Sequence, residues 1–236
     1  MFEDHIIDAV REHAAESAPR ECCGLIVSVD GAATYQRCRN ISENDEQFIM
    51  EPDDYAAAAD KGQVLGIAHS HNYVSPEPSQ ADVVGCERSG LPWLIVNHPV
   101  GNYTVVEPTG YVAPLEGRQF VHGVFDCYAI IVDYYKQKLG ITLPDFDREE
   151  AWWEKGYDLY MQNYEKAGFT DVTGSEILEH DVVIMQCRSP VPNHAGVYLG
   201  DSRILQHLTG RLSGVDVYGG YWQRSTVAVV RHKDLM

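Results

Sequence analysis

A chain of 236 residues with 44% hydrophobic side chains has enough apolar material for two domains of ordinary size, and this composition excludes an intrinsically disordered protein. Its 18 Lys and Arg residues against 35 Asp and Glu residues give a formal net charge of −17, which disfavours nucleic acid as a partner and indicates a solvated, acidic surface. No apolar run approaches the about 20 residues that span a bilayer, so we expect no membrane span, no signal peptide and synthesis in a cytoplasm.

The first predicted elements alternate between helix and strand. Apolar residues at Phe2, Ile6, Ile7 and Val10 have the spacing of an amphipathic N-terminal helix. The sequence then predicts strands over residues 23–29, 64–71 and 93–96, and helices over residues 52–60 and 79–88. Mixed elements of this kind predict an α+β domain over residues 1–106.

A seam follows at residues 107–119, where Pro108, Gly110, Pro114 and Gly117 interrupt any regular element and predict a linker. We expect a second α+β domain over residues 120–236, in which helices precede strands. The predicted helices are 127–139 and 147–167, and the predicted strands are 182–187, 194–199, 203–208 and 226–232. The six cysteines show no zinc-knuckle or disulfide-framework spacing, which suits a reducing compartment.

Two histidines end the apolar run VLGIAHSH of the first domain. His69 and His71 are two residues apart, so on a strand they share one face, and Asp82 follows in the first turn of a predicted helix. Two histidines and one carboxylate leave a fourth position of a tetrahedral zinc site open, as in catalytic sites. Each residue alone favours a simpler interpretation, because Ser79 to Asp82 is also a helix-capping pattern and an isolated His-x-His is a weak signal.

Taken together, these residues resemble the signature of the JAB/MPN (JAMM) metalloproteases. That signature is His-x-His, seven residues, Ser, two residues and Asp, with an upstream Glu, and the chain carries Glu21 in the segment ECCGL. The resemblance implies a JAB/MPN-like α/β metalloprotease fold in which His69, His71 and Asp82 bind Zn²⁺. It further implies that Glu21 is the general base and that Ser79 helps to hold the oxyanion, while the substrate is left open.

One cysteine of the second domain stands where a loop meets a helix. Asp126 is a good N-cap for that helix, and the apolar spacing predicts that Ile130, Ile131, Tyr134 and Tyr135 form its core face. Cys127 then lies at the helix start, where free N–H groups and the helix dipole favour a thiolate. The alternative is a buried and inert cysteine.

Two histidines flank a predicted hairpin in HAGVYLGDSRILQH, with a two-residue turn at Gly200-Asp201. Counting outward from this turn pairs Tyr198 with Arg203 and His194 with His207. Residues paired in this way have Cβ atoms about 5 Å apart, so one imidazole could orient the other. Cys127, His194 and His207 are therefore candidates for a nucleophile, a base and an orienting group.

The segments DCYAIIVDYY, DVVIMQC, NHAGVYLG and ILQH resemble, in order and spacing, the NlpC-type cell-wall endopeptidases. The resemblance implies a papain-like α+β fold and hydrolysis, through an acyl-enzyme, of the amide between D-γ-glutamate and the diamino acid of peptidoglycan stem peptides. Cys127 would attack, His194 would carry the proton and His207 would hold the ring. Five aromatic residues at helical spacing are interpreted as core and not as part of the site: Trp152, Trp153, Tyr157, Tyr160 and Tyr164.

The two modules in this order resemble the tail tip assembly proteins of lambdoid phages over nearly the whole chain. That resemblance implies a place at the virion tail tip, with other tail tip proteins and peptidoglycan stem peptides as partners. A structural tail scaffold with vestigial peptidase sites is the main alternative. A deubiquitinase-like intracellular protease is a weaker one, because a cell-wall module beside it would have no purpose.

Overall fold

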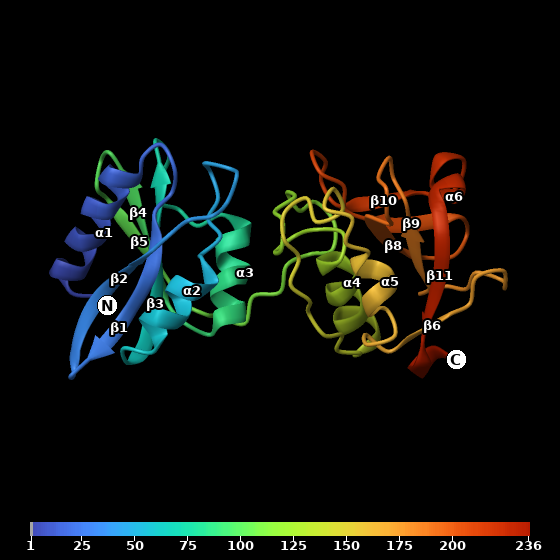
Figure 1. Ribbon diagram of the computed structural model, residues 1–236, viewed down its shortest axis with the longest axis horizontal. Helices are drawn as coiled ribbons and strands as arrows, with labels where there is room; N and C mark the ends of the chain where they lie inside the picture. Colours follow the sequence, from blue (N-terminus) through green and yellow to red (C-terminus); the bar gives the residue numbers. More distant parts are fainter. Residues whose placement is uncertain (1) are drawn as a thin grey trace. The chain divides into compact units, whose positions relative to one another are not determined.

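The computed structural model describes residues 2–236, which divide into two compact units (Figure 1). The first unit ends at Ala113 and the second begins at Pro114. Each unit has its own sheet and its own core, which confirms the predicted α+β class with two domains. None of the helices within residues 2–236 combines the length and the apolar character needed to cross a membrane.

The first unit is a five-stranded sheet with helices on both faces (Figure 1). The strands lie in the order β2-β1-β3-β4-β5, and only the β3–β4 pair is parallel. Its elements are α1 (Asp4–Ser17), β1 (Cys23–Val29), β2 (Ala32–Cys38), α2 (Pro52–Ala59), β3 (Gln63–Asn72), α3 (Gln80–Ser89), β4 (Trp93–His98) and β5 (Tyr103–Val106).

Strand alternation decides which face of this sheet carries the histidines. Ala68 of β3 joins the core under α1, while Ile67 joins the core that contains Cys86 of α3. Successive side chains of a strand point to opposite faces. His69 and His71 therefore share the face of Ile67, on the side of the sheet where α3 packs.

The second unit is a six-stranded antiparallel sheet in the order β10-β9-β8-β7-β11-β6. As predicted, Ile130, Ile131, Tyr134 and Tyr135 pack into its core. The elements are α4 (Ala129–Tyr134), the π-helical turn η1 (Tyr135–Leu139), α5 (Leu159–Asn163), β6 (Phe169–Asp171), β7 (Val182–Met185), β8 (His194–Tyr198), β9 (Arg203–Gln206), β10 (Gly214–Val217), α6 (Tyr221–Ser225), β11 (Thr226–His232) and the 3-10 turn η2 (Lys233–Leu235).

The predicted helix over residues 147–167 is wrong over most of its length. The chain forms irregular turns up to residue 158, and only α5 is helical. Ala151 and Gly156 adopt left-handed backbone conformations, with φ of 51° and 77°, which end any right-handed helix. The helical spacing of the aromatic residues here does not correspond to one continuous helix, since Trp152 is buried whereas Tyr157 is exposed.

The predicted register of the β8–β9 hairpin is also wrong, by one residue. Tyr198 pairs with Ile204 and Gly196 with Gln206, because Gly200, Asp201 and Ser202 all adopt left-handed conformations and form a longer turn. His194 and His207 are therefore not directly opposed. An added turn residue shifts every cross-strand partner.

Residues 107–119, predicted as a linker, make hydrogen bonds to both units. In the first unit, the carboxylate of Glu87 on α3 accepts the backbone N–H groups of Thr109, Gly110 and Tyr111 at 2.6 to 3.0 Å. In the second unit, Gly117 N–H donates to the carbonyl of Ser213 at 2.8 Å. Residues 109–111 are thereby hydrogen-bonded to the first unit and Gly117 to the second.

Candidate active sites

Three side chains predicted to bind a metal converge in the first unit. His69 and His71 come from β3, and Asp82 comes from the first turn of α3. The Nε2 atoms of the two histidines are 3.3 Å apart, and the carboxylate oxygens of Asp82 lie 3.3 Å from His69 Nε2 and 3.2 Å from His71 Nε2. All three side chains are buried, so the cluster is a small triangle of donor atoms shielded from bulk water.

The distances between the donor atoms are close to the edge lengths of a zinc tetrahedron, although the contacts to the two histidines involve different oxygens of the Asp82 carboxylate. Ligand atoms about 2.0 to 2.1 Å from a tetrahedral ion are about 3.3 Å from one another. His71 Nδ1 donates to the carbonyl of Ser75 at 3.0 Å, which leaves the Nε2 lone pair facing the cluster, as in histidine ligands of metals. The three residues therefore fit a single Zn²⁺ ion with one position left open.

Burial and neighbouring charges shift the pKa values of this cluster in opposite directions. Burial raises the pKa of Asp82, but the neighbouring His69 ring and hydrogen bonds from His69, His71 and Ser79 outweigh it, so this pKa is lowered. Burial lowers the pKa of His71, but the hydrogen bond to Asp82 reverses the direction and raises it. Burial raises the pKa of Glu21 to about 7, although the two histidine rings oppose this. A carboxyl group with such a pKa can take up or release a proton at neutral pH.

Ser79 and Asp82 also form the capping box of α3. Ser79 Oγ accepts the N–H of Asp82 at 3.1 Å, and Asp82 Oδ2 accepts the N–H of Ser79 at 2.7 Å. The capping interpretation and the metal-site interpretation are therefore both satisfied by one geometry, because the box fixes the carboxylate that faces the two histidines.

Substitution of the cap should loosen the helix that carries the carboxylate. Ser79→Ala is expected to destabilise α3 by about 1 kcal/mol, the usual cost of losing an N-cap hydroxyl, while Ser79→Asp should retain most of the capping. Amide hydrogen exchange of α3 in the full chain measures this effect. Equal exchange in the wild type and Ser79→Ala would show that the cap contributes nothing.

The second unit brings its predicted residues around one cavity. Cys127 just before α4 and His194 at the start of β8 line a cavity of about 510 Å³, together with His207. Trp152, Trp153 and Tyr160 line it as well. Their spacing in the sequence predicts core positions, and only the three-dimensional structure shows that they border the cavity.

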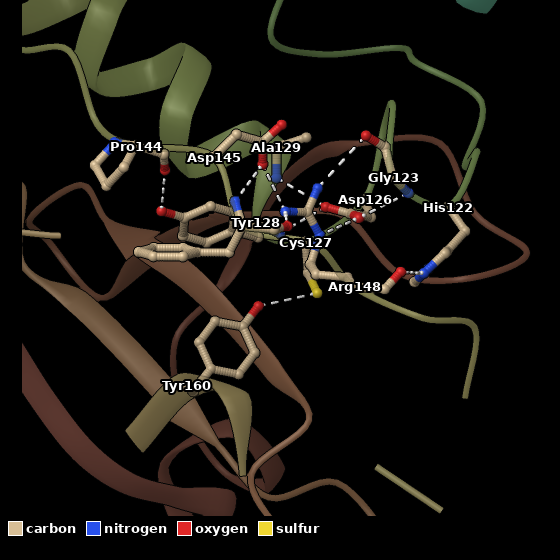
Figure 2. A network of polar contacts seen from close by, with 11 residues as sticks. His122, Gly123, Asp126, Cys127, Tyr128, Ala129, Pro144, Asp145, Arg148 and Tyr160 are labelled. Atoms are coloured by element: carbon tan, nitrogen blue, oxygen red, sulfur yellow. Dashed lines mark hydrogen bonds and ion pairs between the residues drawn. The ribbon is translucent and has the colours of Figure 1, made fainter. Parts of the chain in front are cut away.

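A buried ion pair anchors the turn that carries the cysteine (Figure 2). Asp126 Oδ1 accepts the N–H groups of Tyr128 at 3.0 Å and Ala129 at 2.8 Å, as expected of an N-cap. Its Oδ2 accepts the N–H of Gly123 at 3.0 Å and Arg148 Nε at 2.9 Å. The N–H of Ile130 also donates to the Asp126 carbonyl at 3.2 Å, so Cys127 directly follows the capping residue at the start of the helix, whose regular pattern begins at Ala129.

Electrostatics keep the sulfur of Cys127 protonated in this arrangement. Burial raises the pKa of the thiol to about 11, and the Asp126 carboxylate adds to the rise, while the hydrogen bond to Tyr160 opposes it. The thiolate expected from the helix start is therefore outweighed. Burial also lowers the pKa of His194 to about 4. At neutral pH the cavity therefore contains the Cys127 thiol and a neutral His194 imidazole, which can accept a proton.

The residue that contacts His194 is Gln206, which the sequence analysis missed. Its Oε1 lies 2.9 Å from His194 Nε2. Neither ring nitrogen of His207 makes a hydrogen bond of good geometry within residues 2–236. Burial lowers the pKa of His207, although backbone groups of Arg118 and Arg211 oppose this. If the sequence had predicted a turn of three residues instead of two, it would also have predicted Gln206 diagonally across from His194 on the same face of the sheet.

Tyr160 is the nearest polar partner of the sulfur, with its hydroxyl 3.1 Å from Cys127 Sγ (Figure 2). This hydrogen bond lowers the pKa of the thiol, so Tyr160→Phe is expected to slow alkylation of Cys127 by iodoacetamide at pH 7 about fivefold, the effect of one ordinary hydrogen bond. Mass spectrometry of the peptide that contains Cys127 gives the rate, and Tyr157→Phe, at an exposed tyrosine, is the control. A rate unchanged or increased in Tyr160→Phe would contradict this role.

The lowered pKa of His194 also predicts how stability depends on pH. Because the folded state binds this proton less well than the unfolded chain, the contribution is present above pH 6.5 and is lost as pH falls through about 4. Between these values the wild type should lose on the order of 2 to 3 kcal/mol more than His194→Asn. Chemical unfolding followed by tryptophan fluorescence tests this, and parallel pH curves for the two proteins would refute it.

Comparison with known families assigns each unit. The family described as prokaryotic homologs of the JAB domain matches residues 3–107, and the NlpC/P60 family matches residues 117–231. The first unit thus has a JAB/MPN-like fold and the second an NlpC/P60-like fold. The first unit is also 30% identical over 103 residues to a desampylase of Pyrococcus furiosus, covering 41% of this chain and 73% of that protein.

Two phage proteins match both units at once. The tail tip assembly protein K of Escherichia phage N15 is 42% identical over 232 residues, which cover 97% of this chain and 95% of that protein. The tail tip assembly protein K of Escherichia phage lambda is 38% identical over 184 residues, which cover 78% of this chain and 89% of that protein. With this identity over nearly its whole length, the chain belongs to the family of phage tail tip assembly proteins K.

Proposed function

We propose that the second unit is a cysteine endopeptidase that hydrolyses the amide between D-γ-glutamate and the diamino acid of peptidoglycan stem peptides. The observation that carries the proposal is the cavity in which Cys127 and His194 both stand, with Gln206 bonded to the His194 ring. A nucleophile, a base and an orienting group are what acyl transfer through an enzyme thiol requires. The NlpC/P60 match of this unit supports the choice of substrate.

The hydrogen bonds of His194, the proposed base, determine which of its ring nitrogens carries the proton. Gln206 Oε1 can only accept, so His194 Nε2 carries the hydrogen and Nδ1 keeps a lone pair. His194 takes the proton of Cys127 as the sulfur attacks the scissile carbonyl, and the C–N bond then breaks as that proton passes to the leaving amine. Water, deprotonated by the same imidazole, hydrolyses the thioester and restores the thiol. His207 stands in the wall of the same cavity, and the orienting contact belongs to Gln206.

For the first unit we propose a zinc peptidase site. His69, His71 and Asp82 would hold Zn²⁺, which supplies Lewis acidity toward a scissile carbonyl and toward water. Glu21, buried beside these ligands with a pKa of about 7, would move the proton, and Ser79 at the start of α3 would help to hold the oxyanion. Its substrate is proposed to be a protein processed during tail assembly.

Both units act at one place in this proposal. As a component of the virion tail tip, beside other tail tip proteins, the chain would open the cell wall locally when the phage enters its host. The family of the chain supports the setting. Hydrolysis confined to a tail tip needs no diffusion of free enzyme and spares the host wall elsewhere.

Digestion of defined muropeptides by the purified full chain, followed by mass spectrometry, tests the proposed activity. The expected products are two fragments whose masses add up to that of the substrate plus one water and which separate at the D-γ-glutamate to diamino acid bond. An intact muropeptide, or cleavage at a different bond, would overturn the assignment.

A structural role in tail assembly is the second candidate, and the names of the two phage relatives favour it. Complementation separates the two functions. If the enzymatic proposal holds, phage that carry Cys127→Ala alone should assemble tails and yet infect poorly, and phage that carry both Cys127→Ala and His69→Ala should in addition assemble fewer tails. Full infectivity of this double variant would favour a scaffold without catalysis.

A further inference from the structure

A chain of hydrogen bonds continues behind the proposed base to the edge of the sheet. His194 Nε2 contacts Gln206 Oε1 at 2.9 Å, and Gln206 Nε2 donates to Asp216 Oδ2 on β10 at 2.8 Å. Arg211 Nη2 in turn donates to Asp216 Oδ1 at 3.2 Å. Four side chains from β8, β9, β10 and the preceding loop are thus connected in series.

This series determines the orientation of the Gln206 amide. A carboxylate accepts hydrogen bonds and does not donate them, so the NH₂ group of Gln206 must face Asp216. The amide oxygen then faces His194, which fixes Nε2 as the protonated ring nitrogen and Nδ1 as the basic one. If the carboxylate were absent, the amide could rotate by 180° and present its NH₂ group to the ring, which would select the opposite tautomer.

The carboxylate at the end of this series also acts electrostatically on His194. Gln206 is buried, and the Asp216 side chain is about three-quarters buried, with 28% of its surface exposed. Within such surroundings a negative charge polarises the amide that bridges it to the ring. An imidazolium formed at His194 during proton transfer is stabilised through this amide, while the exposed Arg211 screens part of the effect.

We propose that Asp216 is a positioning residue of the cysteine peptidase, which sets the tautomer and raises the basicity of His194 through Gln206. The inference rests on the proposed function of the second unit. It concerns the coupling of base to sulfur, however, and this can be measured without any peptidoglycan substrate.

The experiment is the alkylation rate of Cys127 by iodoacetamide in the full chain between pH 5 and pH 10, followed on its own peptide by mass spectrometry. Asp216→Ala is expected to slow alkylation at pH 7 about tenfold and to shift the reactive limb of the profile to higher pH, within the range by which a general base assists. Asp216→Asn keeps an acceptor but loses the charge, so its alkylation rate should lie between those of the wild type and Asp216→Ala. Asp201→Asn removes an exposed carboxylate from the β8–β9 turn. It is the matched control and should show the same pH profile of alkylation as the wild type.

A rescue separates positioning from a merely structural role. In Gln206→Glu two carboxylates face each other, and alkylation should be slow. Adding Asp216→Asn restores an acceptor for His194 and a donor behind it, and the double variant should recover to within about threefold of the wild-type rate, since the hydrogen bonds are re-formed. Thermal unfolding of each variant identifies any that fail to fold.

The outcomes distinguish this inference from the function on which it rests. Wild-type profiles for folded Asp216→Ala and Asp216→Asn, or a double variant no better than Gln206→Glu alone, would overturn the positioning role even if muropeptides are cleaved. Loss in Asp216→Ala with recovery in the double variant supports the role even if the muropeptides tested are not cleaved, in which case only the substrate assignment fails.

Discussion

Replacing Cys127 with alanine is expected to lower stem-peptide hydrolysis by the full chain by at least about three orders of magnitude, because loss of an enzyme nucleophile removes the covalent route entirely. The cavity and its base stay in place in this variant, so muropeptides should still bind. The measurement is the rate of product formation under single-turnover conditions, together with the dissociation constant of the muropeptide.

Cys38→Ala is the appropriate control for that substitution. It removes a cysteine of the first unit and should leave hydrolysis by the second unit near the wild-type rate. Hydrolysis by Cys127→Ala within a factor of ten of the wild-type rate would show that another group attacks the substrate, since a general base alone contributes about 10² to 10⁴.

Zinc binding should depend on each of the three converging side chains of the first unit. His71→Ala removes one of the three proposed protein ligands together with its hydrogen bond to the carbonyl of Ser75, so affinity for Zn²⁺ should fall by at least about 100-fold. Metal analysis after dialysis against buffered zinc is expected to give close to one ion per wild-type chain and close to none for the variant.

His98→Ala provides the matched control, because His98 ends the neighbouring strand β4 and takes no part in the metal cluster. It should bind zinc like the wild type. Equal zinc content in His71→Ala and the wild type would contradict the ligand set, as would a wild-type chain that binds no transition metal under these conditions.

Local sequence patterns predicted the elements that carry both sites. Alternation along residues 64–71 placed His69 and His71 on one face, and the capping pattern at Ser79 placed Asp82 at a helix start. These predictions succeeded because strand alternation and helix capping are settled by neighbours in the chain.

What failed depended on backbone conformation and on contacts between distant residues. Two predictions, the helix over residues 147–167 and the hairpin register, were wrong because residues other than glycine adopt left-handed conformations there: Ala151, Asp201 and Ser202. No periodicity in the sequence reports such conformations. Gln206 was missed for the same reason, since one extra turn residue decides which side chain reaches His194.

The opposed pKa shifts at Cys127 and His194 also lay beyond sequence reasoning. A helix start favours a thiolate, but burial and the Asp126 carboxylate, itself required to cap the turn, act more strongly in the opposite direction. Both pKa shifts favour a neutral thiol and a neutral imidazole at pH 7, so in the proposed mechanism proton transfer accompanies attack on the substrate.

The most direct test that stem peptides are hydrolysed at Cys127 and not at the metal site is a single muropeptide digestion carried out under three conditions: untreated protein, protein alkylated at Cys127, and protein stripped of metal by a chelator. The account predicts cleavage at the D-γ-glutamate to diamino acid bond that alkylation abolishes and chelation leaves unchanged. Cleavage that survives complete alkylation of Cys127 and disappears with the chelator would contradict it.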